Sequence, residues 1–134
     1  MAEESLNYLK PENHQIILDM TFGAGGHSRK ILKAAPNIKL LALDRDPKAF
    51  SFAKELAEEY PSQVIPLLGR FSELPNLLAS HNIKQNSIDC ILFDFGCSSM
   101  QFDEADRGFS VSKNGPLDMR MDGNRYPGNL YIRI

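Results

Sequence analysis

The sequence predicts an α/β domain built on a parallel sheet, and three observations support this fold class. Short apolar runs alternate with amphipathic helical patterns along the first two thirds of the chain. A glycine-rich loop joins the first apolar run to a helical pattern, and the third run contains Pro66. Proline lacks the N–H of the strand ladder and therefore favours an edge strand. A doubly wound sheet of order 3-2-1-4 has its third strand at the edge.

The boundaries of the elements follow from the same patterns. The apolar runs predict strands at residues 15–18, 39–43, 64–68 and 88–93. The amphipathic stretches predict helices at residues 27–35, 46–60 and 72–78. Asp46 followed by Pro47 is a typical helix start, and Pro36 and Pro61 end the helices before them. Asp94 closes the fourth strand.

The composition limits the possible classes of protein. With 134 residues, 43% hydrophobic and 24% charged, the chain is typical of one folded domain. A net charge of -2 gives no overall attraction to a polyanion, so a nucleic-acid contact requires a local patch or a further segment. No apolar stretch approaches the length of a membrane span, so we expect no membrane partner. Cys90 and Cys97 fit no paired metal spacing, and we expect no metal.

The glycine loop is the first candidate site. Residues 19–27 read D-M-T-F-G-A-G-G-H, in which Gly23, Gly25 and Gly26 allow a sharp turn and a close approach of the backbone to a ligand. Asp44 ends the second strand 19 residues after Gly25, where its carboxylate can accept hydrogen bonds from both hydroxyls of a ribose. Together these features predict a site for a nucleoside-containing cofactor. A structural turn and a solvated strand-end acid are the alternatives.

Two further residues separate the candidate cofactors. Asp19 precedes Gly23 by four residues, where its charge would repel the pyrophosphate of NAD. Ser28 replaces the third glycine of the dinucleotide fingerprint. S-adenosylmethionine has no phosphate and carries a positive sulfonium and a positive amino group, so acidic residues near the loop favour it.

Three other residues or segments have both a functional and a structural interpretation. His27 begins the first predicted helix as a ligand contact or as a packing residue. Phe71 follows the third strand, where its ring could cover an adenine or belong to the core. Residues 94–122 form a long segment without periodicity after a strand end, which is typical of functional loops. Its cations Arg107, Lys113, Arg120 and Arg125 could contact RNA phosphates or pair with the acids between them.

The motifs in this order resemble those of the MraW (RsmH) family, which methylates the exocyclic N(4) amine of a cytosine in small-subunit rRNA. They are D-x-T-F-G-x-G-G-H, L-D-R-D-P, D-x-G-x-S-S-x-Q and R-G-F-S-x-x-x-x-G-P-L-D-M-R-M-D. The resemblance implies the class I (Rossmann-like) S-adenosylmethionine-dependent methyltransferase fold. By position it implies a cofactor pocket lined by Gly25, Gly26, His27, Asp44, Phe71, Asp94 and Gln101. Asp94 is also the candidate that orients the target amine.

The details G-C-S-S-M-Q and R-Y-P look like the animal mitochondrial members. The resemblance therefore implies a place in the mitochondrial matrix, with the cytoplasm as the alternative, and a role in rRNA processing and small-subunit assembly. Small-subunit rRNA or the ribosomal subunit is the implied partner. The opening residues 1–5 are acidic, unlike a transit peptide, so no presequence is visible in the chain.

We expect four segments: a lead-in at 1–14, a cofactor-binding half-domain at 15–94, the family's signature loop region at 95–127 and a divergent tail at 128–134. The helical insert domain and the later strands of the family are expected to be absent. An uncovered sheet edge at Ile91, Leu92 and Phe93 then favours self-association. The alternatives to an active methyltransferase are an inactive cofactor-binding remnant, such as a splice or pseudogene product, and a fragment of a nucleotide-binding oxidoreductase.

Overall fold

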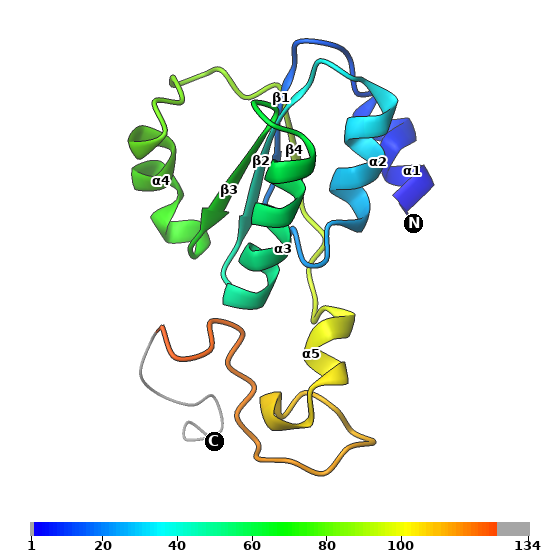
Figure 1. Cartoon of the computed structure of the whole chain (residues 1–134), viewed down its shortest axis with the longest axis vertical. Helices are drawn as coiled ribbons and strands as arrows, with labels where there is room; N and C mark the ends of the chain where they lie inside the picture. Colours follow the sequence, from blue (N-terminus) through cyan, green and yellow to red (C-terminus); the bar gives the residue numbers. More distant parts are fainter. Residues whose placement is uncertain (1, 126–134) are drawn as a thin grey trace. The chain divides into compact units, whose positions relative to one another are not determined.

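A four-stranded parallel sheet forms the centre of the first of two units in the computed structural model, which describes residues 2–125 (Figure 1). The first unit extends to Asp94 and the second begins at Phe95. The strands are β1 (Ile16–Asp19), β2 (Lys39–Asp44), β3 (Val64–Leu68) and β4 (Cys90–Leu92). Their order is β3-β2-β1-β4, and every neighbouring pair is parallel. The predicted α/β class and the strand order 3-2-1-4 are confirmed.

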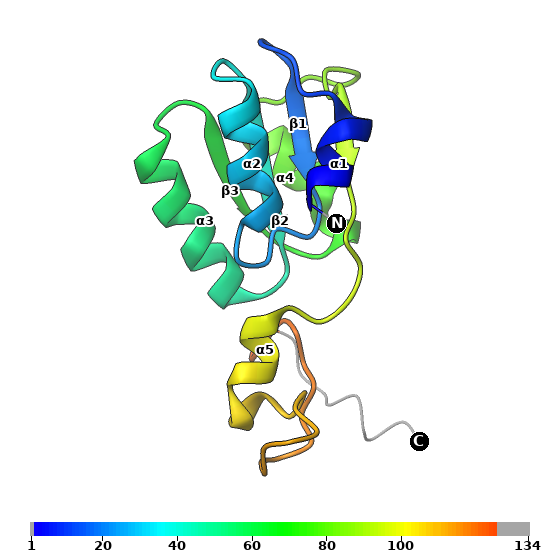
Figure 2. The same cartoon turned by 90° about the vertical axis from the view of Figure 1, so that its right-hand side faces the viewer.

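Helices cover both faces of this sheet (Figures 1 and 2). On one face, α2 (Gly26–Ala34) and α3 (Pro47–Glu59) bury Ile31 and Leu56 against β1 and β2. On the other face, α4 (Leu74–Ser80) packs Leu74 and Leu77 against the alternate strand residues. Successive strand side chains point to opposite faces, so nearly continuous apolar strands supply both cores.

The edge position of β3 agrees with its proline. Pro66 lies opposite Ala42 of β2, and in the described residues no strand pairs with the other side of β3. Because proline can donate no ladder hydrogen bond, this position tolerates it where a central strand would not. The sequence-based prediction of an edge strand was therefore correct for a physical reason that the structure displays.

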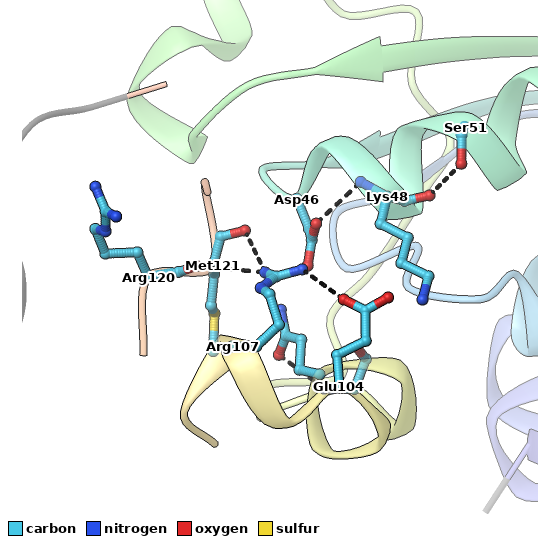
Figure 3. A network of polar contacts seen from close by, with 9 residues as sticks. Asp46, Lys48, Ser51, Glu104, Arg107, Arg120 and Met121 are labelled. Carbon is cyan, nitrogen blue, oxygen red and sulfur yellow. Dashed lines mark hydrogen bonds and ion pairs between the residues drawn. The ribbon is translucent and has the colours of Figure 1, made fainter. Parts of the chain in front are cut away.

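The predicted helix boundaries shift by a residue or two. Gly25, with φ 79°, is the N-cap of α2, so this helix begins at Gly26. It ends at Ala34 because Ala35 is extended, as expected for a residue that precedes proline. The start of α3 is as predicted: the Asp46 carboxylate accepts a hydrogen bond from the Lys48 N–H at 3.0 Å, with Pro47 at the first helical position (Figure 3).

Two parts of the first unit differ from the predictions. The fourth strand was predicted at residues 88–93, but β4 contains only Cys90–Leu92. After Leu92 the chain turns to the glycine loop, where the Asp94 N–H donates to the Thr21 hydroxyl at 2.7 Å, so the strand ends early. No helix was predicted before residue 15, yet α1 (Ala2–Leu9) packs Leu6 and Leu9 against the core beside α2.

The second unit has little regular structure, but two of its glycines lie against distant parts of its own backbone. It contains α5 (Ser99–Asp103) and a short 3-10 helix at Ala105–Arg107. A Cβ atom on Gly108 would lie 2.2 Å from the carbonyl oxygen of Pro116, and one on Gly115 would lie 2.2 Å from that of Ala105. Two glycines are therefore required where distant parts of this segment touch. The expected divergent tail at 128–134 lies outside the described residues.

The outer side of β4 is the second edge of the described sheet. Ile91 is 51% exposed there. Self-association through this edge stays a prediction. None of the helices in the described part of the chain is long and apolar enough to cross a membrane.

The packing of α3 makes a first prediction. Leu56 is fully buried in the core cluster formed by α2, α3 and the strands, so Leu56→Ala should leave a cavity and lower the free energy of unfolding by about 2–5 kcal/mol. Urea denaturation followed by circular dichroism measures this. The control is Glu55→Ala, an exposed position on the same helix, which should change stability by no more than about 0.5 kcal/mol. Equal effects of the two changes would contradict the packing of α3.

Candidate functional site

The glycine loop between β1 and α2 is held in a defined conformation. The Gly23 N–H donates to the Asp44 carboxylate at 2.7 Å, which joins the loop to the end of β2. Gly25 is left-handed, with φ 79°, and a Cβ atom there would lie 2.7 Å from the ring of the buried Phe22. Any other residue at this position would therefore be strained and would also displace Phe22.

Gly26, the first residue of α2, faces open space. A Cβ atom built on it would meet nothing within 4 Å. Open space above the first turn of a helix is where backbone N–H groups can reach a ligand, since the first N–H groups of a helix have no intrahelical partner. Gly25 is therefore required by the backbone conformation of the loop, whereas the space beside Gly26 can accommodate a ligand.

Asp44 is half-buried at the end of β2, and its carboxylate already organises the backbone. One oxygen accepts from the Gly23 N–H and the other from the Asp46 N–H at 2.9 Å. Burial raises the pKa of Asp44, while these hydrogen bonds act in the opposite direction. The Arg45 N–H is a third backbone donor to this carboxylate. A carboxylate has about four acceptor sites, so these contacts leave capacity for at least one ribose hydroxyl.

Asp19 lies beneath the loop. Its side chain is 1% exposed and accepts hydrogen bonds from the Ser28 hydroxyl at 2.7 Å and the Thr21 N–H at 3.1 Å. Burial raises the pKa of Asp19 to about 6, against the lowering effect of the Ser28 hydroxyl. The sequence-based prediction placed Asp19 beside a bound ligand and was wrong in this respect, because the carboxylate is buried under the loop and holds it through hydrogen bonds.

His27 and Asp94 are brought together at the same edge of the sheet. The His27 Nδ1 atom lies 3.8 Å from an Asp94 carboxylate oxygen, and the two side chains are 21% and 49% exposed. The Asp94 backbone is fixed through the Thr21 hydroxyl. Asp94 can therefore accept a hydrogen bond from a ligand or substrate amine while its main chain stays in place.

Phe71 begins the short 3-10 helix Phe71–Glu73 that follows β3. Its ring is 46% exposed and contacts the ring of Phe93, which directly follows β4 and is also 46% exposed. The ring centroids are 5.8 Å apart and the planes are nearly perpendicular, at 89°. Phe71 is thus not a core aromatic residue, which was the alternative interpretation of its position.

Gln101 belongs to the second unit, whereas the other six residues implied by the resemblance belong to the first. It lies in α5, is 3% exposed, and its side-chain oxygen accepts a hydrogen bond from the Ser98 N–H at 3.1 Å. In this unit Gln101 therefore stabilises the start of α5. Its place in a cofactor pocket stays a prediction.

The cations of the signature segment have local partners. Figure 3 shows the Arg107 guanidinium with the carbonyl oxygens of Arg120 and Met121, at 3.3 and 3.1 Å, and Glu104 at 3.8 Å. Arg120 donates to the Asp118 carboxylate at 2.7 Å and holds the pKa of that group below its usual range. These contacts favour local pairing over phosphate binding as the role of Arg107 and Arg120.

Some residues of the site were not predicted. Thr21 links the loop to Asp94, Phe22 fills the space below Gly25, and Phe93 contacts Phe71. Only the position of Phe93 at a strand end could have indicated it, because the other two contacts depend on the path of the loop. Within residues 2–125 no three His, Cys, Asp or Glu side chains are grouped as metal ligands would be.

Comparison with known proteins identifies the relatives of the chain. The MraW methylase family matches residues 1–127. The 12S rRNA N(4)-cytidine methyltransferase METTL15 of Bos taurus is 52% identical over 95% of this chain and 31% of its own length. The ribosomal RNA small subunit methyltransferase H of Wolbachia (strain wRi) is 45% identical over 94% of the chain and 42% of its own length.

A protein of Culex quinquefasciatus named as a receptor-type tyrosine-protein phosphatase, mosPTP-1, is 62% identical over 95% of this chain. The match covers 9% of that protein, so its name says nothing about the matching segment. The chain spans less than half the length of these three relatives.

The buried Asp19 predicts an unusual pH dependence of stability. Its pKa is raised in the folded state, so folding takes up a proton, and its contribution to stability is present below about pH 4 and lost as the pH rises through about 6. In the wild type, ionisation of Asp19 should therefore lower the free energy of unfolding between pH 4 and pH 7 by up to about 3 kcal/mol. This decrease should be absent in Asp19→Asn.

Urea unfolding of both proteins at a series of pH values measures the difference. Glu58→Gln, which replaces an exposed carboxylate on α3, is the control and should show the same change of the free energy of unfolding with pH as the wild type. If Asp19→Asn also shows the wild-type change, ionisation of Asp19 does not destabilise the folded protein.

Proposed function

Because this chain belongs to the MraW methylase family, we propose that it forms the cofactor-binding part of an S-adenosylmethionine-dependent methyltransferase. The proposed acceptor is the exocyclic N(4) amine of a cytosine in small-subunit rRNA. The name of METTL15 states N(4)-cytidine methylation of 12S rRNA for that protein, and the name of the Wolbachia enzyme states small-subunit ribosomal RNA. The family match favours this function over an oxidoreductase fragment. An inactive cofactor-binding remnant is the alternative that experiment must separate.

The main support for the proposal is that the glycine loop is hydrogen-bonded to Asp44, the residue expected to bind the ribose. The Gly23 N–H is bound to the Asp44 carboxylate, so the loop and the acid form one preorganised unit. Gly26 adjoins open space, and the rings of Phe71 and Phe93 are half exposed. A backbone surface, a ribose acceptor and an aromatic face at one sheet edge are what an adenosine-containing ligand needs.

These residues fit S-adenosylmethionine. Asp44 would hold the ribose, Phe71 would cover the adenine, and Gly25 and Gly26 would allow the backbone to approach. Bound there, the cofactor supplies a methyl group on a positively charged sulfur. The acids Asp19 and Asp44 give the loop a negative field that suits a cation and disfavours a pyrophosphate.

The target amine is a poor nucleophile because its lone pair is delocalised into the cytosine ring. Alignment of this amine with the methyl group therefore has to supply most of the rate enhancement. Asp94 is suited to accept a hydrogen bond from the amine, since its side chain is half exposed and its backbone is fixed by Thr21. The base must be unstacked to reach such a site.

The same relatives support a proposal for the RNA partner and the compartment. We propose small-subunit rRNA as the partner and a mitochondrial location, from the similarity to proteins named for the 12S rRNA. Among the described residues, the local pairing of Arg107 and Arg120 does not favour either side chain as a phosphate contact. With a net charge of -2, recognition of rRNA would then depend on other residues.

Cofactor binding is the first test. Asp44→Ala should weaken binding of S-adenosylmethionine or S-adenosylhomocysteine by about 1–3 kcal/mol, roughly 5- to 150-fold, because the ribose hydroxyls lose their acceptor. Isothermal titration calorimetry measures the affinity. Circular dichroism must show that the variant is folded at the temperature used, since Asp44 also holds the Gly23 and Asp46 N–H groups.

Glu55→Ala serves as the control and should bind like the wild type. NAD should neither bind nor raise the melting temperature. Equal thermal protection by NAD would contradict the choice of cofactor, and unchanged affinity in Asp44→Ala would remove Asp44 from the site.

Methyl transfer is the second test. With S-adenosylmethionine labelled at the methyl group and small ribosomal subunits as acceptor, we expect label at N(4) of a cytosine. Asp94→Asn should lower the rate at least about tenfold, as loss of a positioned hydrogen-bonding charge does, with a smaller change in cofactor affinity. Binding without any transfer by this chain would instead support the cofactor-binding remnant.

A further inference from the structure

The two outer strands of the sheet carry aromatic rings that meet. Phe71 lies three residues after the end of β3, and Phe93 directly follows the end of β4. In the order β3-β2-β1-β4 these strands are separated by about 14 Å, three interstrand spacings. The ring centroids are nevertheless 5.8 Å apart. The chain after β3 must therefore turn back across the carboxyl ends of the inner strands.

Specific contacts fix this turn. The Gly69 N–H donates to the Asp44 carbonyl at 2.9 Å, which attaches the segment after β3 to the end of β2. The Arg70 N–H donates to the Glu73 carboxylate at 2.7 Å and caps the short helix that starts at Phe71. The main chain of Phe71 is thus anchored to the residue proposed to bind the ribose. Its side chain still requires a contact that sets the direction of the ring.

Phe93 supplies such a contact. The planes of the two rings are at 89°, the edge-to-face arrangement in which the positive edge of one ring meets the negative face of the other. Both rings are 46% exposed, although two phenylalanines of the core would be covered. Exposed neighbouring aromatic residues beside a candidate site are typical of a binding surface.

We propose that Phe93 is a positioning residue for the cofactor, and that it holds the Phe71 ring in the orientation that covers the adenine. This inference rests on the proposed function, because it assumes that Phe71 contacts an adenine. It assigns to the residue before Asp94 a role in affinity for the nucleoside half of the ligand. Phe93 acts through Phe71, so the two residues should not contribute independently.

A double-mutant cycle on binding of S-adenosylhomocysteine tests this. Phe93→Leu should weaken binding about 2- to 10-fold, the range expected for loss of one aromatic pair. Phe71→Leu should weaken it further, and the double variant should bind no more weakly than Phe71→Leu alone. Phe93→Tyr should restore most of the affinity, because a tyrosine ring retains the same edge-to-face contact.

Two further arms separate positioning from a general loss of structure. Adenosine alone should show the same loss in Phe93→Leu as S-adenosylhomocysteine, since the effect lies in the nucleoside half. Tyr8→Leu, which removes an aromatic ring that is 89% exposed on α1, is the matched control and should bind like the wild type.

Additive losses in the cycle, or a loss for S-adenosylhomocysteine without one for adenosine, would overturn the positioning role. Unchanged affinity in Phe93→Leu would do the same. Failure of the wild type to bind S-adenosylhomocysteine at all would instead contradict the proposed function.

Discussion

The hydrogen bonds of the buried Asp19 carboxylate are the contacts on which the candidate site depends. This carboxylate accepts from the Thr21 N–H at the start of the glycine loop and from the Ser28 hydroxyl in the first turns of α2. It therefore fixes the two ends of the loop relative to β1. Thr21 in turn accepts the Asp94 N–H, so the position of β4's end also depends on this loop. Removing an acceptor at Asp19 would leave buried donors without partners, which costs about 1–3 kcal/mol for each group.

Burial strengthens the hydrogen bonds by which Asp19 holds the loop, but it also makes ionisation of this carboxyl group unfavourable. The pKa of Asp19 is raised by burial, and the nearby charge of Asp44 raises it further. Burial raises the pKa of Asp44 as well. Two acids held close together in this way are stabilised by a neighbouring cation. The proposed preference for S-adenosylmethionine over NAD therefore keeps its electrostatic basis, and the buried Asp19 would contribute to it through its charge without contacting the ligand.

Local rules predicted most of the fold because the decisive residues carry strong local preferences. Pro66 indicated an edge strand, and Asp46 with Pro47 indicated a helix start. The lead-in helix α1 was missed because it depends on packing of Leu6 and Leu9 against the core. The early end of β4 was missed because a hydrogen bond to Thr21, far away in the sequence, replaces a strand contact.

The candidate site shows the same division. The loop glycines and Asp44 could be recognised from the spacing of a strand, a turn and a helix. The contact between Phe71 and Phe93 could not, since it depends on a chain reversal across the sheet that only the Gly69 and Arg70 hydrogen bonds reveal. Spacing predicts which residues share a sheet edge, but not which of their side chains touch.

The motifs after residue 94 identify the family, but they do not show which of their residues would contact a ligand. Gly108 and Gly115 are required where the segment folds against itself, and Arg107 ties it to the carbonyl oxygens of Arg120 and Met121. Residues of a motif can thus be required by the local fold of the segment, without any contact to a ligand. Six of the seven residues implied for the cofactor lie in the first unit, with the loop, Asp44 and the aromatic pair. The proposed cofactor binding would therefore have most of its structural basis in that unit, and it can be measured without assigning any role to the second.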